Sequence, residues 1–270
     1  MLVDGREVGT IDAVDRGLHF GDGVFETLVC RQGAVRFLEL HLERLRTGCR
    51  RLGLPAPDPA TLRTELRALA LPRQSCVLKL ILTRGSALRR GYGATGAERP
   101  RRVLLRYGLV SGTDPGAARG VRVRIARLRL GENPALAGLK HLNRLENVLA
   151  RNEWHDVRIA EALLFSHAGW LISGTMSNVF LVNEGRLMTP RVDRCGVAGV
   201  MRRVVLREAL RCGLEASEAE LDAATLARAD EVFLTNVRIG IWPIRALGER
   251  RLVPGPVTRQ LQALVGDLDA

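Results

Sequence analysis

The sequence predicts an α/β (α+β) protein made of two domains. Strand-like and helix-like patterns alternate along the whole chain, and a stretch rich in Gly, Ser, Asp and Pro interrupts them near the middle. We therefore expect an N-terminal α/β domain over residues 1–107, an interdomain linker over residues 108–120, and a C-terminal domain over residues 121–270. A chain of 270 residues is long enough for a sizeable buried core.

The first half contains signals for a hairpin, strands and two helices. Asp4-Gly5 predicts a tight turn, and Asp58-Pro59 predicts a helix start, because aspartate caps a helix and proline is tolerated at its first position. The expected elements are a hairpin over 2–10, strands over 28–30, 77–82 and 101–107, and helices over 37–52 and 58–71.

The second half alternates strands with shorter helices. Leu142, Leu145, Val148 and Leu149 recur at three- and four-residue spacing, which predicts one apolar helix face, and Lys140 would lie at the entry to that helix. The expected elements are strands over 121–125, 162–165, 170–172 and 231–236, the helix that follows Lys140, and helices ending at 210, over 221–229 and over 256–268.

Lys140 is the first candidate for chemistry. The chain has only two lysines, Lys79 and Lys140, among its 41 basic residues. Arginine stays charged, whereas a lysine that is buried or lies beside another charge can lose its proton and act as a nucleophile. The choice of lysine at position 140 therefore suggests that a deprotonatable amine is needed there, although most lysines in proteins are solvated surface residues.

Composition and charge exclude several classes of protein. The net charge of +12 is compatible with nucleic acid or an anionic metabolite as partner, but the basic residues are scattered without interleaved aromatics, so nucleic-acid binding is a minor alternative. Five cysteines form no CxxC pair and no metal-ligand spacing with the histidines, as expected for reduced thiols in the cytoplasm and for a protein without a metal site. No signal peptide or membrane span is expected.

The segment Lys-His-Leu-Asn-Arg-Leu-Glu over residues 140–146 resembles the active-site lysine segment of 4-amino-4-deoxychorismate lyases. These are fold-type IV enzymes that use pyridoxal 5'-phosphate, alongside branched-chain and D-amino-acid transaminases. Residues 15–27, the His-x-x-Arg-Leu pattern over 41–45, and residues 173–182 are similar to further family motifs. The resemblance implies a fold-type IV structure of two α/β domains with the cofactor between them, a homodimer, and a small anionic substrate.

The resemblance also assigns residues. It implies that Lys140 is the catalytic lysine, that Arg44 holds the cofactor phosphate, and that a helix start at residues 200–201 holds it through backbone amides. One position departs from the family, because Ser173 stands where relatives usually have a glutamate that pairs with the pyridine nitrogen. The implied cofactor-binding residues are Lys140, Arg44, Ser173, Asn178, Val200, Met201, Thr235 and Asn236.

The function implied is conversion of 4-amino-4-deoxychorismate to 4-aminobenzoate and pyruvate, in folate precursor synthesis. The alternative is an amino-acid transaminase of the same fold type, for branched-chain or D-amino acids. A basic nucleic-acid-binding protein and a cofactor-binding protein without catalysis remain alternatives from other classes. The arginines that would receive the substrate carboxylates are not defined by spacing; Arg84, Arg90 and Arg106 are candidates.

Overall fold

The structure, a computed structural model, describes residues 1–86, 90–109, 114–266 and 268. The chain forms two compact units. Unit 1 comprises Met1–Ser111 and Leu139–Asn143, and unit 2 comprises Gly112–Gly138 and Arg144–Asp269. Each unit combines helices with a sheet, so the expected mixed α/β class is confirmed.

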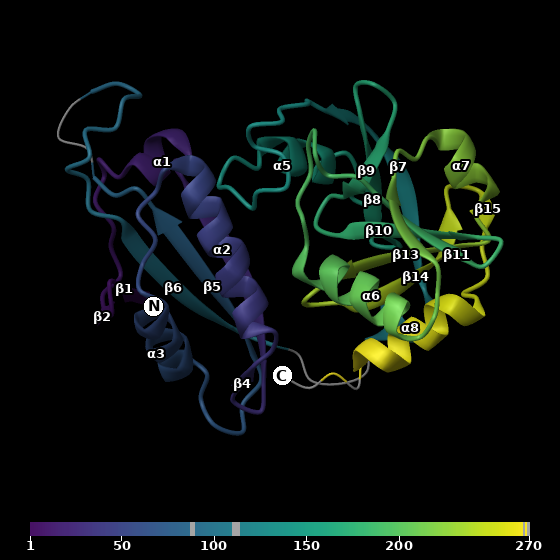
Figure 1. Cartoon of the computed structure of the whole chain (residues 1–270), viewed down its shortest axis with the longest axis horizontal. Coiled ribbons are helices and arrows are strands. Elements are labelled where there is room, and N and C mark those ends of the chain that lie inside the picture. The colour runs from purple at the N-terminus through teal and green to yellow at the C-terminus, as the bar shows by residue number, and fades with distance from the viewer. Residues whose placement is uncertain (87–89, 110–113, 267, 269–270) are drawn as a thin grey trace. The chain divides into compact units, whose positions relative to one another are not determined.

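The described part of unit 1 is built on a six-stranded sheet in the order β2-β1-β6-β5-β3-β4, in which all neighbours are antiparallel. Helices α2 and α3 belong to this unit, and α2 crosses one face of the sheet (Figure 1). The elements are β1 (Leu2–Val3), β2 (Arg6–Glu7), α1 (Arg16–Phe20), β3 (Gly23–Arg31), β4 (Ala34–Val35), α2 (Leu38–Leu52), α3 (Pro59–Leu69), β5 (Cys76–Thr83) and β6 (Arg101–Gly108).

Helices α2 and α3 form where the sequence predicts them, whereas α1 was not predicted. Leu42, Leu45 and Cys49 of α2 are buried against the sheet, which gives this helix its apolar face. The carboxylate of Asp58 accepts a hydrogen bond from the Thr61 amide at 2.9 Å, and this cap starts α3.

The central strands β3 and β5 present two different faces. Their alternate residues, among them Val24, Leu28 and Leu80, are buried in the core beneath α2. The intervening residues, including Phe25 and Lys79, are only half buried, because α2 packs on the other face. The half-buried face is therefore where unit 1 can present side chains to a ligand.

The described part of unit 2 holds a nine-stranded sheet in the order β12-β11-β10-β13-β14-β7-β8-β9, with β15 paired to β14. β9 also contacts β10 and β11, so the sheet curls back on itself. The elements are α4 (Pro115–Arg119), β7 (Val121–Leu130), α5 (Leu145–Arg151), β8 (Ile159–Ser166), β9 (Leu171–Gly174), β10 (Asn178–Asn183), β11 (Arg186–Pro190), α6 (Val200–Arg211), β12 (Ala216–Ala219), α7 (Ala223–Arg228), β13 (Glu231–Asn236), β14 (Gly240–Leu247), β15 (Arg250–Arg251) and α8 (Pro256–Gly266).

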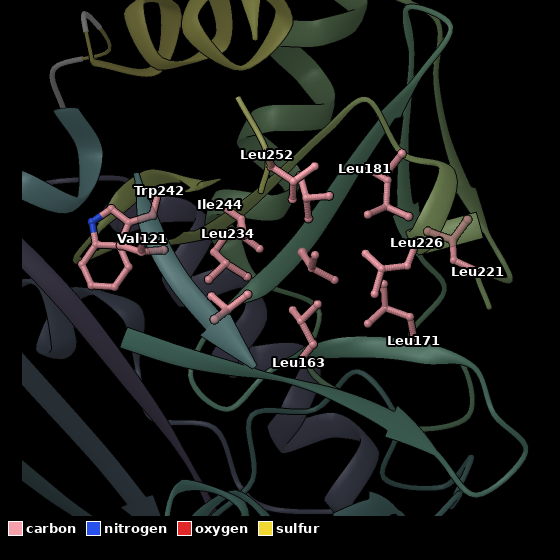
Figure 2. Close-up of a cluster of buried hydrophobic side chains, with 14 of the residues drawn as sticks. Val121, Leu163, Leu171, Leu181, Leu221, Leu226, Leu234, Trp242, Ile244 and Leu252 are labelled. Carbon is pink, nitrogen blue, oxygen red and sulfur yellow. The ribbon is translucent and has the colours of Figure 1, made fainter. Parts of the chain in front are cut away.

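The core of unit 2 fills the inside of this curled sheet. Figure 2 shows side chains from β7, β8, β13 and β14, such as Val121, Leu163, Leu234 and Ile244, pointing toward one another. Helices α6 and α8 pack against each other beside the sheet (Figure 1). Burial of this apolar surface is the main force that holds the strands in place, and it fixes the strand ends where the predicted site residues lie.

The structure describes only part of the predicted linker, and the end of that part is helical. The predicted linker over 108–120 falls partly on residues 110–113, which lie outside the described residues. Its later part forms α4, where Asp114 caps the helix and accepts a hydrogen bond from the indole of Trp242 at 2.8 Å. This part of the linker is therefore packed against β14. The domain boundaries themselves stay a prediction.

The helix expected directly after Lys140 begins later, at Leu145, and its apolar face is exposed. Leu145, Val148 and Leu149 are 76%, 50% and 59% exposed. The helix starts late because residues 140–142 pair with β3 in an extended conformation. The buried residue of α5 is instead Ala150, which packs in the core against residues of β7 and β8.

Among the described residues, every helix is too short or too polar to cross a lipid bilayer.

Candidate active site

Lys140 is held by backbone pairing with β3. The Phe25 amide donates a hydrogen bond to the Lys140 carbonyl at 2.9 Å, the Leu142 amide donates to the Gly23 carbonyl at 3.0 Å, and His141 forms an antiparallel bridge with Val24. These contacts extend the sheet of unit 1 by a short edge segment. The position of the lysine backbone is therefore fixed by a core strand, although Lys140 itself lies outside any helix.

The side chain of Lys140 lies against Phe25. Its Nζ is 4.2 Å from the centre of the phenyl ring, and the Nζ of Lys79, on β5, is 5.4 Å from the centre of the same ring. Cations are attracted to the face of an aromatic ring. Both lysines of the chain thus lie beside one phenylalanine, on the half-buried face of the unit 1 sheet.

Arg44 belongs to a buried polar cluster between α2 and β3. Its guanidinium donates to both carboxylate oxygens of Glu26, Nε to Oε1 at 2.8 Å and Nη2 to Oε2 at 2.5 Å. His41 shares the same carboxylate, with 2.6 Å between its Nδ1 and Oε2. Glu26 is 1% exposed and His41 is fully buried, so the orientation of Arg44 is fixed by partners inside the core.

The charges in this cluster are set by burial and by Arg44. Burial by itself would raise the pKa of Glu26, but the charge and hydrogen bonds of Arg44, with a smaller contribution from His41, outweigh it and lower the pKa to about 2. Burial lowers the pKa of His41, and the positive charges of Arg44 and Lys140 lower it further against the opposing effect of Glu26. Near neutral pH, Glu26 is therefore ionised and His41 is neutral.

In unit 2, the loop that follows Ser173 and joins β9 to β10 is anchored by Glu161 of β8. This carboxylate is 1% exposed and accepts five hydrogen bonds. Its donors are the amides of Ala162, Thr175 and Met176, each at 3.0 Å, the hydroxyl of Ser177 at 3.1 Å, and the hydroxyl of Thr175. Glu161 is thus occupied with fixing the loop between β9 and β10.

Asn178, Thr235 and Gly199 meet at one end of the unit 2 sheet. Asn178 pairs with Thr235 across β10 and β13, and its Nδ2 donates to the carbonyl of Val197 at 2.9 Å. Gly199 packs so closely on this amide that an added Cβ would lie 2.0 Å from Asn178 Oδ1. The Asn178 side chain therefore connects the strand ends to the start of α6.

Asn236 joins the same cluster. Its Nδ2 donates to the carbonyl of Met176 at 3.1 Å, and its Oδ1 accepts from the amides of Arg238 and Ile239 at 2.9 and 3.0 Å. Thr235 is fully buried and its hydroxyl donates to the Gly240 carbonyl at 2.7 Å. The polar residues at the end of β13 therefore stiffen the turn into β14 and connect it to the loop between β9 and β10.

Helix α6 begins at Val200 with no side-chain cap. Its N-cap residue is Gly199, and its first turn carries no acidic residue. The first amides of a helix have no partner within the helix and lie at the positive end of its dipole, which favours an anion such as phosphate. Val200 and Met201 are 5% and 1% exposed, so their side chains face the core. These two residues can therefore offer an anion only their backbone amides, at the start of α6.

Two of the three arginines considered for the substrate carboxylates, Arg84 and Arg106, bind other groups of the protein. Arg84 donates to both oxygens of Asp22 and to the carbonyls of Leu52 and Gly53, which occupies its guanidinium. Arg106 donates to Gln74 Oε1 at 2.5 Å. Arg90 is exposed. Arg84 therefore connects the segment before β3 to the C-terminal end of α2.

The structure groups the predicted site residues by unit. Lys140 and Arg44 lie in unit 1, and the other six lie together in unit 2 at the ends of β9, β10 and β13 and at the start of α6. Sequence reasoning missed Glu26 and Glu161 as the carboxylates that fix these groups. A signal was available for both, since each is a lone carboxylate inside an apolar strand.

This combination of units and residues defines a class of protein: a two-unit α/β protein with a half-buried lysine on one unit and, on the other, a helix start that no side chain caps. Residues 23–247 match the family described as amino-transferase class IV, so the chain belongs to this family. The family membership expected from residues 140–146 is thereby confirmed.

Individual relatives agree with this assignment. The chain is 31% identical to aminodeoxychorismate lyase of Vibrio harveyi over 94% of both chains. The crystal structure of 4-amino-4-deoxychorismate lyase from Pseudomonas aeruginosa matches with a TM-score of 0.94 and 47% identity, covering 100% of this chain and 99% of the other. The branched-chain aminotransferase of Escherichia coli shares the fold, with a TM-score of 0.85 at 21% identity. The expected fold-type IV architecture is thus confirmed.

Proposed function

We propose that the chain is a pyridoxal-phosphate-dependent lyase that converts 4-amino-4-deoxychorismate to 4-aminobenzoate and pyruvate, a step toward folate in the cytoplasm. The observation that carries this proposal is Lys140, held by β3 with its amine against Phe25, in a chain that resembles a lyase of this name over its full length. A lysine positioned by a core strand can serve both as the attachment point of an aldehyde cofactor and as a proton carrier.

The residues present fit pyridoxal 5'-phosphate. The cofactor needs an amine for its aldehyde and an anion site for its phosphate. On unit 1, Lys140 supplies the amine and Arg44 supplies a guanidinium that suits an anion. On unit 2, the amides of Val200 and Met201 supply donors that suit a phosphate. The close approach of Gly199 to Asn178 leaves no room for a side chain at position 199, the N-cap of α6.

We assign the remaining predicted residues to the same cofactor. Ser173 supplies a hydroxyl for the pyridine nitrogen, in place of the carboxylate usual in relatives, and Asn178, Thr235 and Asn236 form the polar floor beside the phosphate site. A neutral hydroxyl gives a hydrogen bond about half as strong as a charge-assisted one. Glu161 does not take the place of the missing carboxylate, because its oxygens already accept hydrogen bonds from the loop.

The chemistry follows from the substrate and Lys140. When bound, the cofactor supplies an aldehyde for the substrate amine and a ring that withdraws electrons from the neighbouring carbon. The Nζ of Lys140 takes the proton from substrate C4 and returns a proton to the leaving enolpyruvyl group. The ether C–O bond breaks with its electrons on oxygen, the enol becomes pyruvate, and the ring becomes aromatic. Products and substrate contain the same atoms, so the reaction needs no co-reactant.

Product analysis tests the assignment. The purified protein, loaded with pyridoxal 5'-phosphate, is given 4-amino-4-deoxychorismate, and 4-aminobenzoate and pyruvate are measured together. Equal amounts of both are expected, and Lys140→Ala should form neither. Amino-group transfer to 2-oxoglutarate from branched-chain or D-amino acids, without 4-aminobenzoate formation, would instead assign the chain to the transaminases of its family.

We also propose that the chain forms a homodimer through α5. Leu145, Val148 and Leu149 form an exposed apolar face on this helix. Contiguous apolar surface of this kind is typical of sites that bind another protein chain. Light scattering after size exclusion should report a dimer for the native chain and a monomer for a Leu145→Ser, Leu149→Ser variant. Val157→Ser is the matched control, because Val157 is 96% exposed and lies outside this face. A variant that stays dimeric would remove α5 from the interface.

A further inference from the structure

Lys79 is the second lysine beside Phe25. It lies on β5, the central strand of the unit 1 sheet, opposite Thr27 of β3 and Leu105 of β6. Its Nζ is 5.4 Å from the centre of the Phe25 ring, against which the amine of Lys140 also lies. The chain uses lysine at only these two places among 41 basic residues.

Within the described part of the chain, no carboxylate neutralises the charge of Lys79. Its cross-strand neighbours are uncharged, and no carboxylate of the described residues forms an ion pair with it. The side chain is half buried, on the face of the sheet opposite α2. A half-buried cation gains from an anion that contacts it, since burial weakens the compensation by water.

The arginines of this region do not provide an equivalent charge. The guanidinium of Arg84 is occupied by Asp22 and two carbonyls, and Arg106 pairs across the sheet with the core residue Leu78 and donates to Gln74. Lysine also suits the position because its ammonium is a compact point charge on a flexible stem, whereas the larger guanidinium has a fixed planar shape.

We propose that Lys79 binds a carboxylate of the substrate and thereby places the substrate amine next to Lys140. The inference rests on the proposed function, because 4-amino-4-deoxychorismate carries two carboxylates and one amine. Both amines lie within 5.4 Å of the centre of the Phe25 ring, so one anionic substrate can be within reach of both, and the ring offers an apolar surface beside them. Lys79 is thus a specificity determinant, and transaminase substrates with a different spacing of carboxylate and amine would use it less well.

Binding and kinetics of Lys79→Met, Lys79→Gln and Lys79→Arg test the inference. Methionine and glutamine remove the charge, whereas arginine keeps it. The first readout is the KM and kcat for 4-amino-4-deoxychorismate. The second is calorimetric binding of chorismate to the protein loaded with cofactor, because chorismate has both carboxylates but a hydroxyl in place of the amine. Arg106→Gln is the matched control, since it removes one positive charge from the neighbouring strand.

Loss of one charge-assisted contact should weaken binding by about tenfold or more. We expect Lys79→Met and Lys79→Gln to raise both the KM and the Kd for chorismate to this extent, with a smaller change in kcat. Lys79→Arg should recover much of the loss, and Arg106→Gln should stay within twofold of the native chain. Circular dichroism and the absorbance of the bound cofactor should be unchanged in all four variants.

Several outcomes would overturn the inference. Unchanged chorismate binding in both Lys79→Met and Lys79→Gln would do so, as would an equal loss in Arg106→Gln. A change confined to the pH titration of the cofactor absorbance would show that Lys79 acts only on Lys140. If the native chain binds chorismate but releases no 4-aminobenzoate, the proposed function fails, while the chorismate comparison still decides whether Lys79 binds a carboxylate.

Discussion

Replacing Glu26 by glutamine should destabilise unit 1 in a pH-dependent way. Glu26 is buried, and its carboxylate holds Arg44 with two hydrogen bonds and His41 with one. Glu26→Gln keeps the shape of the side chain but leaves the buried side of Arg44 without a counter-charge. Loss of one partner of a buried pair costs roughly 3–5 kcal/mol.

The pKa of Glu26 gives a second route to the size of this effect. Its value in the folded chain is about 2, compared with an ordinary value of 4.5. A difference of this size corresponds to about 3 kcal/mol of folding free energy, which agrees with the first figure. Because the folded pKa is the lower one, the stabilisation is present above pH 4.5 and is lost as the pH falls toward 2.

Urea unfolding followed by circular dichroism measures the difference between the native chain and Glu26→Gln. We expect about 3 kcal/mol at pH 7, shrinking steadily below pH 4.5. All three tryptophans lie in unit 2, so tryptophan fluorescence follows that unit separately. The matched control is Glu39→Gln on α2, the helix that carries Arg44, because the ion pair of Glu39 with Arg63 is exposed and should contribute nothing measurable. A stability difference that stays constant from pH 7 to pH 3 would refute the reasoning.

Three further predictions concern unit 2 and the thiols. Glu161→Gln should lower the melting temperature by roughly 3–10 °C, because the loop loses a buried charged acceptor; differential scanning calorimetry would detect this, and a shift below 1 °C would contradict it. Gly199→Ala should raise the Kd for pyridoxal 5'-phosphate roughly tenfold, or about 1.4 kcal/mol, because the new methyl would collide with Asn178; Gly9→Ala, which meets no neighbouring atom, is the control. In the folded chain only Cys212 should react with a thiol reagent, whereas all five cysteines should react in denaturant, since the other four are buried. Rapid reaction of several thiols in the native chain would disprove that burial.

The elements that the sequence predicts well are those whose signals are local. The apolar face of α2 and the Asp58 cap of α3 depend on residues within the helix itself, so pattern and propensity suffice. The prediction for the segment after Lys140 was wrong in its start and in its burial. There, residues 140–142 pair with β3, more than a hundred positions earlier in the chain, and this pairing prevails over the helical spacing of the leucines.

The sequence predicts the chemically active residues of the site better than the residues that hold them in place. The scarcity of lysine pointed to Lys140 and marked Lys79 as unusual, but only the strand register places both beside Phe25. Glu26 and Glu161 stand out as charges within apolar strands. Their partners lie 14 to 18 positions away in the chain or on the other side of a turn, and nothing in the sequence specifies that pairing.

The proposed function requires that the amine of Lys140 carries the cofactor. Borohydride reduction of the protein loaded with pyridoxal 5'-phosphate, followed by peptide mass spectrometry, tests it directly, because the chain offers only two lysines as attachment points. We expect a pyridoxyl group on the peptide that contains Lys140 and an unmodified Lys79. Attachment to Lys79, or no attachment to either lysine, would contradict it.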